Sequence, residues 1–404
     1  MHATTDTLVS KRLICETVDR LAPAWRELAL RIHAHPELAY EEHLAAEWLS
    51  DALELAGFRV ARGVAQTSTA FSAEFDTLRA APCVAFLAEY DALPGTGHSC
   101  GHNLSGAASC LAGHALAEVV RDVPARIRVL GTPAEEAGHG GKIRMLEHGV
   151  FQDVEFAMMA HAGFMNLPSR EMLGHKRVRV EFSAHAGSQD ASGNTLDAVL
   201  HCLHGVELLR RKLRPRTRIE AVVAEGGSIE RSRSSSRCAS RYDRARAEVL
   251  ISSTEVAYIE RLERRLKGLA QAGADATGTR LEWTATWGTY LPLRRNGAME
   301  AAYANNLECL GEPLGRFPAD WSIGSTDCGN VSQRLPAIHA YFKAAEPGIE
   351  HHTHAFTEAS RSELGLAGMI TAAKAMALTA LDLLLSEPLR ANAKRDFLDG
   401  PRSS

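Results

Sequence analysis

A cysteine and a histidine separated by one residue, Cys100 and His102, stand in the glycine-rich stretch GTGHSCGHN from Gly95 to Asn103. In an extended segment, residues two apart point to the same side, so this thiolate and imidazole can reach one divalent ion or two neighbouring ions. A buried cysteine beside a histidine is also common in protein cores, where the thiol behaves as a small apolar group. The pair therefore predicts a metal site only if further ligands converge on it.

Further metal-ligand types follow the ends of predicted strands. The apolar run APCVAFLAEYDALPG, from Ala81 to Gly95, ends in carboxylates. A strand over 127–130 leads into Glu135 and Glu136, and a strand beginning near Val154 ends on His161. Ligands in open α/β sheets gather at the carboxyl ends of strands, so this regularity predicts a divalent metal site. The alternative for the glutamate pair is a surface-charged loop.

Three histidines in EHHTHAFTEAS, from Glu350 to Ser360, precede a long alanine-rich segment. One of them can complete a metal site. For His351, His352 and His354 taken singly, solvation or helix capping is the alternative interpretation. The residues alone do not choose among the three.

Composition sets the class of protein and of partner. The chain has 404 residues, of which 45% are hydrophobic and 23% charged, which is typical of a globular chain with room for two domains. Its formal net charge of -4 argues against nucleic-acid binding and favours a small-molecule partner. The eight cysteines are too sparse for a disulfide framework, so we expect reduced thiols and a cytoplasmic location.

Two segments bear on membranes and export. The first 20 residues lack an apolar run of signal-peptide type, so export is not expected. The apolar segment from Leu364 to Leu385 is long enough to span a bilayer, but Lys374 and Asp382 interrupt it. Its alanines and glycines favour a buried helix packed on a sheet, and no membrane partner is expected.

The elements that must position these groups are those of an α/β protein. Apolar residues at spacings of three and four predict helices up to Leu55, broken at Pro36. Apolar strands and a helix over 104–120 then form a metal-binding catalytic domain with a central, mostly parallel sheet flanked by helices. From His175 the polar and apolar residues alternate as in half-exposed antiparallel strands. We therefore expect an inserted α+β domain over 175–288, with 1–174 and 289–404 forming the catalytic domain.

Five motifs taken together, EYDALPGTGHSCGHN, GTPAEEAGHGGK, MMAHAG, STDCGNVSQ and HTHAFTEA, resemble the M20 metallopeptidase family. The similarity is greatest to its amidohydrolase branch, which contains aminobenzoyl-glutamate hydrolases and aminoacylase-1-like-2 proteins. The resemblance covers nearly the whole chain in the same order. It implies one or two divalent ions per subunit and a ferredoxin-like lid that also forms a homodimer.

The resemblance also implies roles for individual residues. Metal ligands would be Cys100, His102, Glu136, His161 and His352, with His102 bridging two ions. Glu135 would be the catalytic base, and Asp91 would orient the site. The family places its last ligand histidine directly before a threonine, which selects His352. The cysteine favours zinc, while the oxygen and nitrogen ligands also admit manganese or cobalt.

The predicted lid departs from the family pattern. His185 matches the histidine that stabilises developing negative charge on the substrate. Relatives usually carry a proline soon after it, where this chain has Ser188-Gln189-Asp190, and Arg231 stands near the place of a family asparagine. Arg231 is therefore the candidate for binding a substrate carboxylate, while a solvated basic face is the alternative for the arginines around it.

The function expected from these residues is metal-dependent hydrolysis of a carbon-nitrogen bond in a small carboxylated substrate, of N-acyl amino acid or aminobenzoyl-glutamate type. Because the lid motifs are altered, an alternative is hydrolytic deamination of an electron-poor aromatic amine acid such as 5-nitroanthranilate, in aromatic compound catabolism. A second alternative is a non-catalytic binding protein on the same fold. The complete set of ligand types argues against the last.

Overall fold

The computed structural model describes residues 2–77, 80–136, 140–184, 195–226, 228–229, 240–241, 244–286, 288–317 and 323–400. The chain divides into two compact units. The first comprises Met1–Glu171, Leu293–Ile323 and Asp327–Arg402, and the second comprises Met172–Pro292 with Gly324–Thr326. The second unit is thus an insertion into the first.

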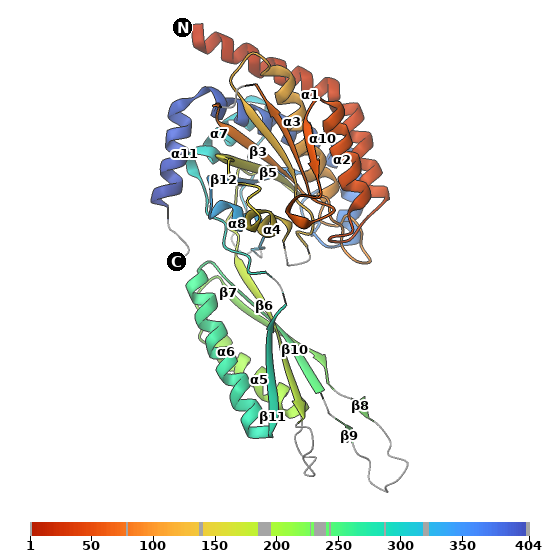
Figure 1. Cartoon of the computed structure of the whole chain (residues 1–404), viewed down its shortest axis with the longest axis vertical. Coiled ribbons are helices and arrows are strands. Elements are labelled where there is room, and N and C mark those ends of the chain that lie inside the picture. The colour runs from red at the N-terminus through yellow and green to blue at the C-terminus, as the bar shows by residue number, and fades with distance from the viewer. Residues whose placement is uncertain are drawn as a thin grey trace. The chain divides into compact units, whose positions relative to one another are not determined.

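The first unit is built on a six-stranded sheet with the strand order β1-β2-β4-β3-β5-β12 (Figure 1). Strand β3 pairs in parallel with β4 and β5, and β5 pairs in parallel with β12, whereas β2 pairs antiparallel with both β1 and β4. The strands are β1 (Arg59–Arg62), β2 (Phe71–Asp76), β3 (Cys83–Ala88), β4 (Arg126–Gly131), β5 (Phe156–Gly163) and β12 (Ala337–Lys343). The predicted α/β class with a mostly parallel sheet is confirmed.

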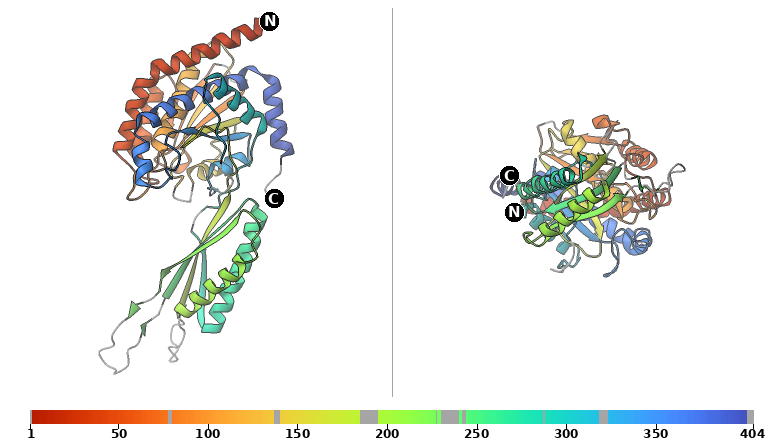
Figure 2. Two further views of the ribbon diagram at one scale, coloured as in Figure 1. Left: turned by 180° about the vertical axis from the view of Figure 1, so that it is seen from behind. Right: turned by 90° about the horizontal axis from the view of Figure 1, so that it is seen from below.

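The central strands are apolar because both of their faces are covered. Every residue of β3 and of β5 is buried, as expected for parallel strands between helical layers. Helices α3 and α10 pack directly on the sheet, and α1 packs on both of them (Figure 2). The helices of this unit are α1 (His2–Ala34), α2 (His43–Leu55), η1 (Val64–Gln66), α3 (His102–Val119), α4 (Gly141–Glu147), α7 (Gly297–Cys309), α8 (Cys328–Ser332), α9 (His354–Ala359), α10 (Glu363–Leu385) and α11 (Glu387–Asp399).

Helix α10 is the one described helix that is long and apolar enough to cross a membrane. Of its most apolar stretch of 18 residues, 72% is buried inside the protein. Ser362 caps its first turn by accepting a hydrogen bond from the Gly365 N–H. It is the core helix that its alanine content predicted.

Close packing of α3 against the sheet brings its first residue to the strand ends. A Cβ atom at Gly106 would lie 2.4 Å from the carbonyl oxygen of Glu89, so only glycine allows this approach. Gly101, just before the helix, has φ +75, and a Cβ there would lie 2.5 Å from that of Ala162. These two glycines let His102 begin α3 directly beside β3 and β5.

The second unit has the element order β-α-β-β-α-β around a four-stranded antiparallel sheet, β11-β6-β10-β7. Its main elements are β6 (Gly174–Ala184), α5 (Thr195–Arg210), β7 (Thr217–Glu225), β10 (Arg244–Ser253), α6 (Val256–Thr277) and β11 (Thr279–Ala285). Helices α5 and α6 pack on each other and on the sheet. A two-residue ribbon, β8 (Ser228–Ile229) with β9 (Ser240–Arg241), is also present. The predicted antiparallel α+β fold is confirmed, although β7 was not foreseen.

Candidate metal centre

Five side chains with metal-binding atoms meet beside the parallel strands of the first unit. Within one group, the ligand atoms of Cys100, His102 and His161 lie within 4.8 Å of one another, and so do those of Cys100, Glu136 and His352 in a second. The Cys100 Sγ is 3.4 Å from the His161 Nε2. Cys100 belongs to both groups, so the five side chains form one continuous cluster.

His161 lies within strand β5, which continues to Gly163, two residues beyond the end that the sequence predicted. Pairing with β12 extends it, because Phe342 and Lys343 lie opposite the added residues. The His161 Nδ1 is 2.7 Å from the carbonyl oxygen of Ala162, which leaves Nε2 facing Cys100.

Asp91 fixes the orientation of two members of the cluster. Its Oδ1 is 2.9 Å from the His102 Nδ1, and its Oδ2 accepts a hydrogen bond of 2.8 Å from the Glu136 backbone N–H. Burial opposes the charge of Asp91, but the neighbouring His102 outweighs it and holds the pKa of Asp91 below its ordinary value. With its Nδ1 occupied, His102 presents Nε2 to the site.

His352, rather than its neighbours, reaches Glu136. The His352 Nε2 is 3.3 Å from the Glu136 Oε1. The backbone there has φ 64, and its N–H donates to the Ser99 carbonyl oxygen at 2.8 Å, which ties the loop to the Cys100 segment. The His351 Nε2 is 2.8 Å from the Ala162 carbonyl oxygen, and His354 begins α9. His354, the third histidine of this stretch, is thus the first residue of α9.

Glu135 lies between the cluster and a second group of carboxylates. Its carboxylate is within 4.8 Å of ligand atoms of His102 and Glu136 on one side and of Glu89 and Asp327 on the other. Burial raises the pKa of Glu135 well above its ordinary value, and the like charges of Glu89 and Glu136 raise it further. A carboxylate in these surroundings readily accepts a proton.

A buried lysine neutralises the carboxylates behind Glu135. The Lys142 Nζ is 2.6 Å from the Glu89 Oε1 and 2.6 Å from the Asp327 Oδ1, and all three side chains are fully buried. The Lys142 backbone N–H also donates to the Asp327 Oδ2 at 3.0 Å. Lys142 and Asp327 stand in two of the five sequence motifs, but no local pattern relates residues that are 185 positions apart.

The residues present fit divalent metal ions. Among the described residues, the buried His102 Nε2 has only a long contact of 3.4 Å with the Glu89 Oε2, and the buried Glu136 Oε1 one of 3.3 Å with the His352 Nε2, so neither atom makes a well-formed hydrogen bond. Such atoms are costly to bury unless a cation or another group pairs with them. One thiol, three imidazoles and carboxylates form a ligand set that zinc accepts and that manganese or cobalt also tolerates.

Two of the predicted site residues are not placed by the structure. His185 and Arg231 both lie outside the described residues. The cluster as described is therefore formed by the first unit alone.

Residues 70–381 match the sequence profile of peptidase family M20/M25/M40. Among curated proteins, the chain is 31% identical to the Xaa-Arg dipeptidase of Mus musculus, over 96% of this chain and 92% of that one. It is 28% identical to one of the subunits of the p-aminobenzoyl-glutamate hydrolase of Escherichia coli, over 94% and 92%. The fold is also that of a dinuclear metal-binding M20 peptidase from Bacillus subtilis, with a TM-score of 0.66 and 19% identity over 91% of this chain and 99% of that one.

These findings confirm the family that the five sequence motifs suggested. The profile and the relatives span both the metal-ligand cluster and the inserted unit. The chain therefore belongs to peptidase family M20/M25/M40 and is a metal-dependent hydrolase.

Proposed function

We propose that this protein hydrolyses the amide bond of a small carboxylated substrate, such as an N-acyl amino acid or an aminobenzoyl-glutamate-like compound. The observation that carries the proposal is the position of Glu135, beside the cluster formed by Cys100, His102, Glu136, His161 and His352. The names of the mouse and Escherichia coli relatives, a dipeptidase and an aminobenzoyl-glutamate hydrolase, support amide chemistry.

One or two divalent ions, zinc, manganese or cobalt, would be held by the five clustered side chains. When bound, such ions supply Lewis acidity that lowers the pKa of water and polarises a carbonyl group. Asp91 keeps His102 in the tautomer whose Nε2 faces the site. Cys100 is fully buried, which raises the pKa of its thiol well above the ordinary value, so a neighbouring cation is needed to favour the thiolate.

Glu135 would move the proton. It accepts a proton from the attacking water as the water oxygen bonds to the carbonyl carbon, and it delivers that proton to the nitrogen as the carbon-nitrogen bond breaks. Its position beside the cluster lets one carboxylate serve both halves of this transfer. Lys142 pairs with Glu89 and Asp327 behind it and neutralises part of their negative charge.

The test is Glu135→Gln, which keeps the shape of the side chain and removes its ability to accept the proton. We expect metal content to stay at the wild-type value while turnover falls by about 100-fold or more. Metal content is read by mass spectrometry of the desalted protein, and turnover by mass change across a panel of N-acyl amino acids, aminobenzoyl-glutamate and dipeptides. An unchanged rate would remove Glu135 as the base.

The same panel includes 5-nitroanthranilate with an assay for free ammonia. Ammonia from this aryl amine, without cleavage of any amide, would replace amide hydrolysis by hydrolytic deamination. A chain that binds metal and panel compounds but turns over none of them would be a binding protein.

We further propose that residues 1–174 and 289–404 form the catalytic domain and that 175–288 form a lid that joins two copies in a homodimer. Support comes from the edge strand β7 and the adjacent helix α5, which expose Val222, Val223, Leu200 and Leu208 to 60%, 46%, 52% and 47%. An exposed apolar strand edge is a template for pairing with a second chain. Val222→Lys should convert a dimer to a monomer in light scattering, whereas an already monomeric wild type contradicts the proposal.

A cytoplasmic location remains part of the proposal. It is supported by the seven cysteines in the described part of the chain, all of which are free thiols.

A further inference from the structure

Arg170 is an arginine beside the metal-ligand cluster that has no carboxylate partner among the residues that the structure describes. Most of the half-buried arginines elsewhere in the protein have one; Arg128, for example, pairs with Glu74 and Asp153. Arg170 donates one hydrogen bond, from Nε to the Tyr341 hydroxyl at 3.0 Å. In the part of the chain that the structure describes, its terminal nitrogens have neither a hydrogen bond nor an ion pair.

The guanidinium is held in place by two aromatic rings. Its Cζ lies 4.6 Å from the centre of the Phe317 ring and 4.7 Å from that of Tyr341. Tyr341 is part of β12, while Arg170 follows β5 and Phe317 comes from the segment after α7. Three separate segments thus fix the plane of the guanidinium while its terminal nitrogens are left for another partner.

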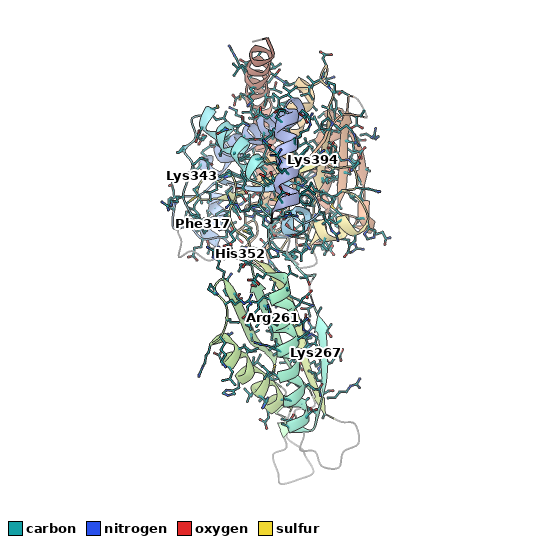
Figure 3. The ribbon with its side chains drawn as sticks, turned by 90° about the vertical axis from the view of Figure 1, so that its left-hand side faces the viewer. Arg261, Lys267, Phe317, Lys343, His352 and Lys394 are labelled. Carbon is teal, nitrogen blue, oxygen red and sulfur yellow. The ribbon has the colours of Figure 1, made fainter. Side chains whose placement is uncertain are left out.

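This arginine is close to the candidate metal ligands. The Tyr341 ring centre is 5.5 Å from that of His161 and 5.0 Å from that of His339. Figure 3 labels Phe317 and His352 at the same end of the first unit. The guanidinium therefore lies within one side-chain layer of the cluster.

The side chains that lie between Arg170 and the cluster bring no carboxylate to it. Tyr341 and His339 pack on His161, with ring centres 5.5 Å from that of His161 in both cases, and His351 packs on His161 at 5.4 Å. The positive charge of Arg170 therefore has no carboxylate counter-charge among these three side chains.

We propose that Arg170 binds the carboxylate of the substrate, in a bidentate pair made by its terminal nitrogens. A planar guanidinium stacked on aromatic rings is suited to this geometry, which a lysine cannot reproduce. The inference rests on the proposed hydrolase function and specifies its substrate class: an anion whose carboxylate lies within a few bonds of the carbon-nitrogen bond that is broken. Arg170 then takes the role that the sequence alone suggested for Arg231.

The test compares each active panel substrate with its carboxamide, which has the same shape and no charge. For Arg170→Met we expect kcat/KM for the acid to fall by about 30-fold or more, mainly through KM, with less than about 3-fold change for the carboxamide. Arg170→Lys should recover only part of the loss. Arg12→Met is the matched control, because it removes one arginine whose side chain is 82% exposed and pairs with Glu16.

A binding measurement keeps this inference separate from the proposed function. Benzoate and benzamide are titrated calorimetrically into the zinc-loaded wild type and into Arg170→Lys, whose melting temperature shows that it is folded. Tighter binding of benzoate than of benzamide, lost in the variant, supports the carboxylate site even if no substrate is turned over. Equal losses for acid and carboxamide, or unchanged benzoate affinity in both Arg170 variants, would overturn it.

Discussion

Replacing Lys142 by methionine tests the buried charge network behind the candidate base. The Lys142 ammonium contacts Glu89 and Asp327 at 2.6 Å each, and no part of the three side chains reaches solvent. Methionine fills most of the volume of the lysine stem, so the cavity left behind is small. The effect of the substitution is therefore mainly the loss of the positive charge.

The magnitude follows from the burial of both carboxylates. Removing one partner of a buried ion pair costs about 3–5 kcal/mol, because the charge that remains has no compensation. For a unit of this size, that is a decrease in melting temperature of roughly 5–9 °C. Lys394→Met is the matched control. Its ammonium pairs with Glu155 at 2.5 Å, but the two side chains are 51% and 36% exposed, so the expected loss is about 1 kcal/mol or less.

The destabilisation should also depend on pH. Burial raises the pKa of Asp327 to about 6, although Lys142 opposes this, and removing Lys142 raises it further. A carboxyl group whose folded-state pKa exceeds its unfolded value loses stability as the pH rises between the two. The gap between wild type and variant should therefore be larger at pH 8 than at pH 5.

The assay is thermal unfolding by circular dichroism of chelator-treated protein, so that loss of metal is not measured as unfolding. A decrease for Lys142→Met no larger than that for Lys394→Met would refute the reasoning, since the network would then contribute no more than a surface pair. Equal losses at pH 5 and pH 8 would show that the uncompensated carboxylates are not the cause.

Three further predictions concern the surroundings of the cluster. Asp91→Asn should lower zinc affinity by about 10- to 100-fold in competition with a chelating dye, because an amide cannot accept hydrogen bonds from both His102 and the Glu136 N–H; unchanged affinity would contradict this role. Burial, with a smaller contribution from Asp91, raises the pKa of Glu42 to about 7. Metal-free protein should therefore lose stability as the pH rises from about 4.5 to 7. In urea unfolding, Glu42→Gln should reduce this dependence of stability on pH. Gly106→Ala should lower the free energy of unfolding by about 1–3 kcal/mol, because its Cβ would clash with the Glu89 carbonyl oxygen. The control is Gly268→Ala, in open space on α6, which should raise the free energy of unfolding by about 1 kcal/mol. An unchanged free energy of unfolding for Gly106→Ala would disprove the close approach.

Local patterns predicted most of the elements that form the centre. Apolar runs indicated β3, β4 and β5, and small apolar residues such as alanine indicated α3 and α10, because burial is expressed in the composition of a few neighbouring residues. The same patterns missed β2 and β7. Both are strands in antiparallel ladders whose outer residues are partly exposed, so their apolar signal is weak.

The sequence by itself determined which residue types could bind a metal ion and where along the chain they stand. Only the tertiary structure decided which of them meet. It turned the His352 Nε2 toward Glu136, in a loop whose backbone N–H donates a hydrogen bond to the Ser99 carbonyl oxygen, and it joined Lys142 to Asp327 across 185 positions. It also placed Arg170 on Tyr341, 171 positions away. Contacts between segments so distant leave no periodic signal, because they depend on how strands and helices pack rather than on the residues beside them.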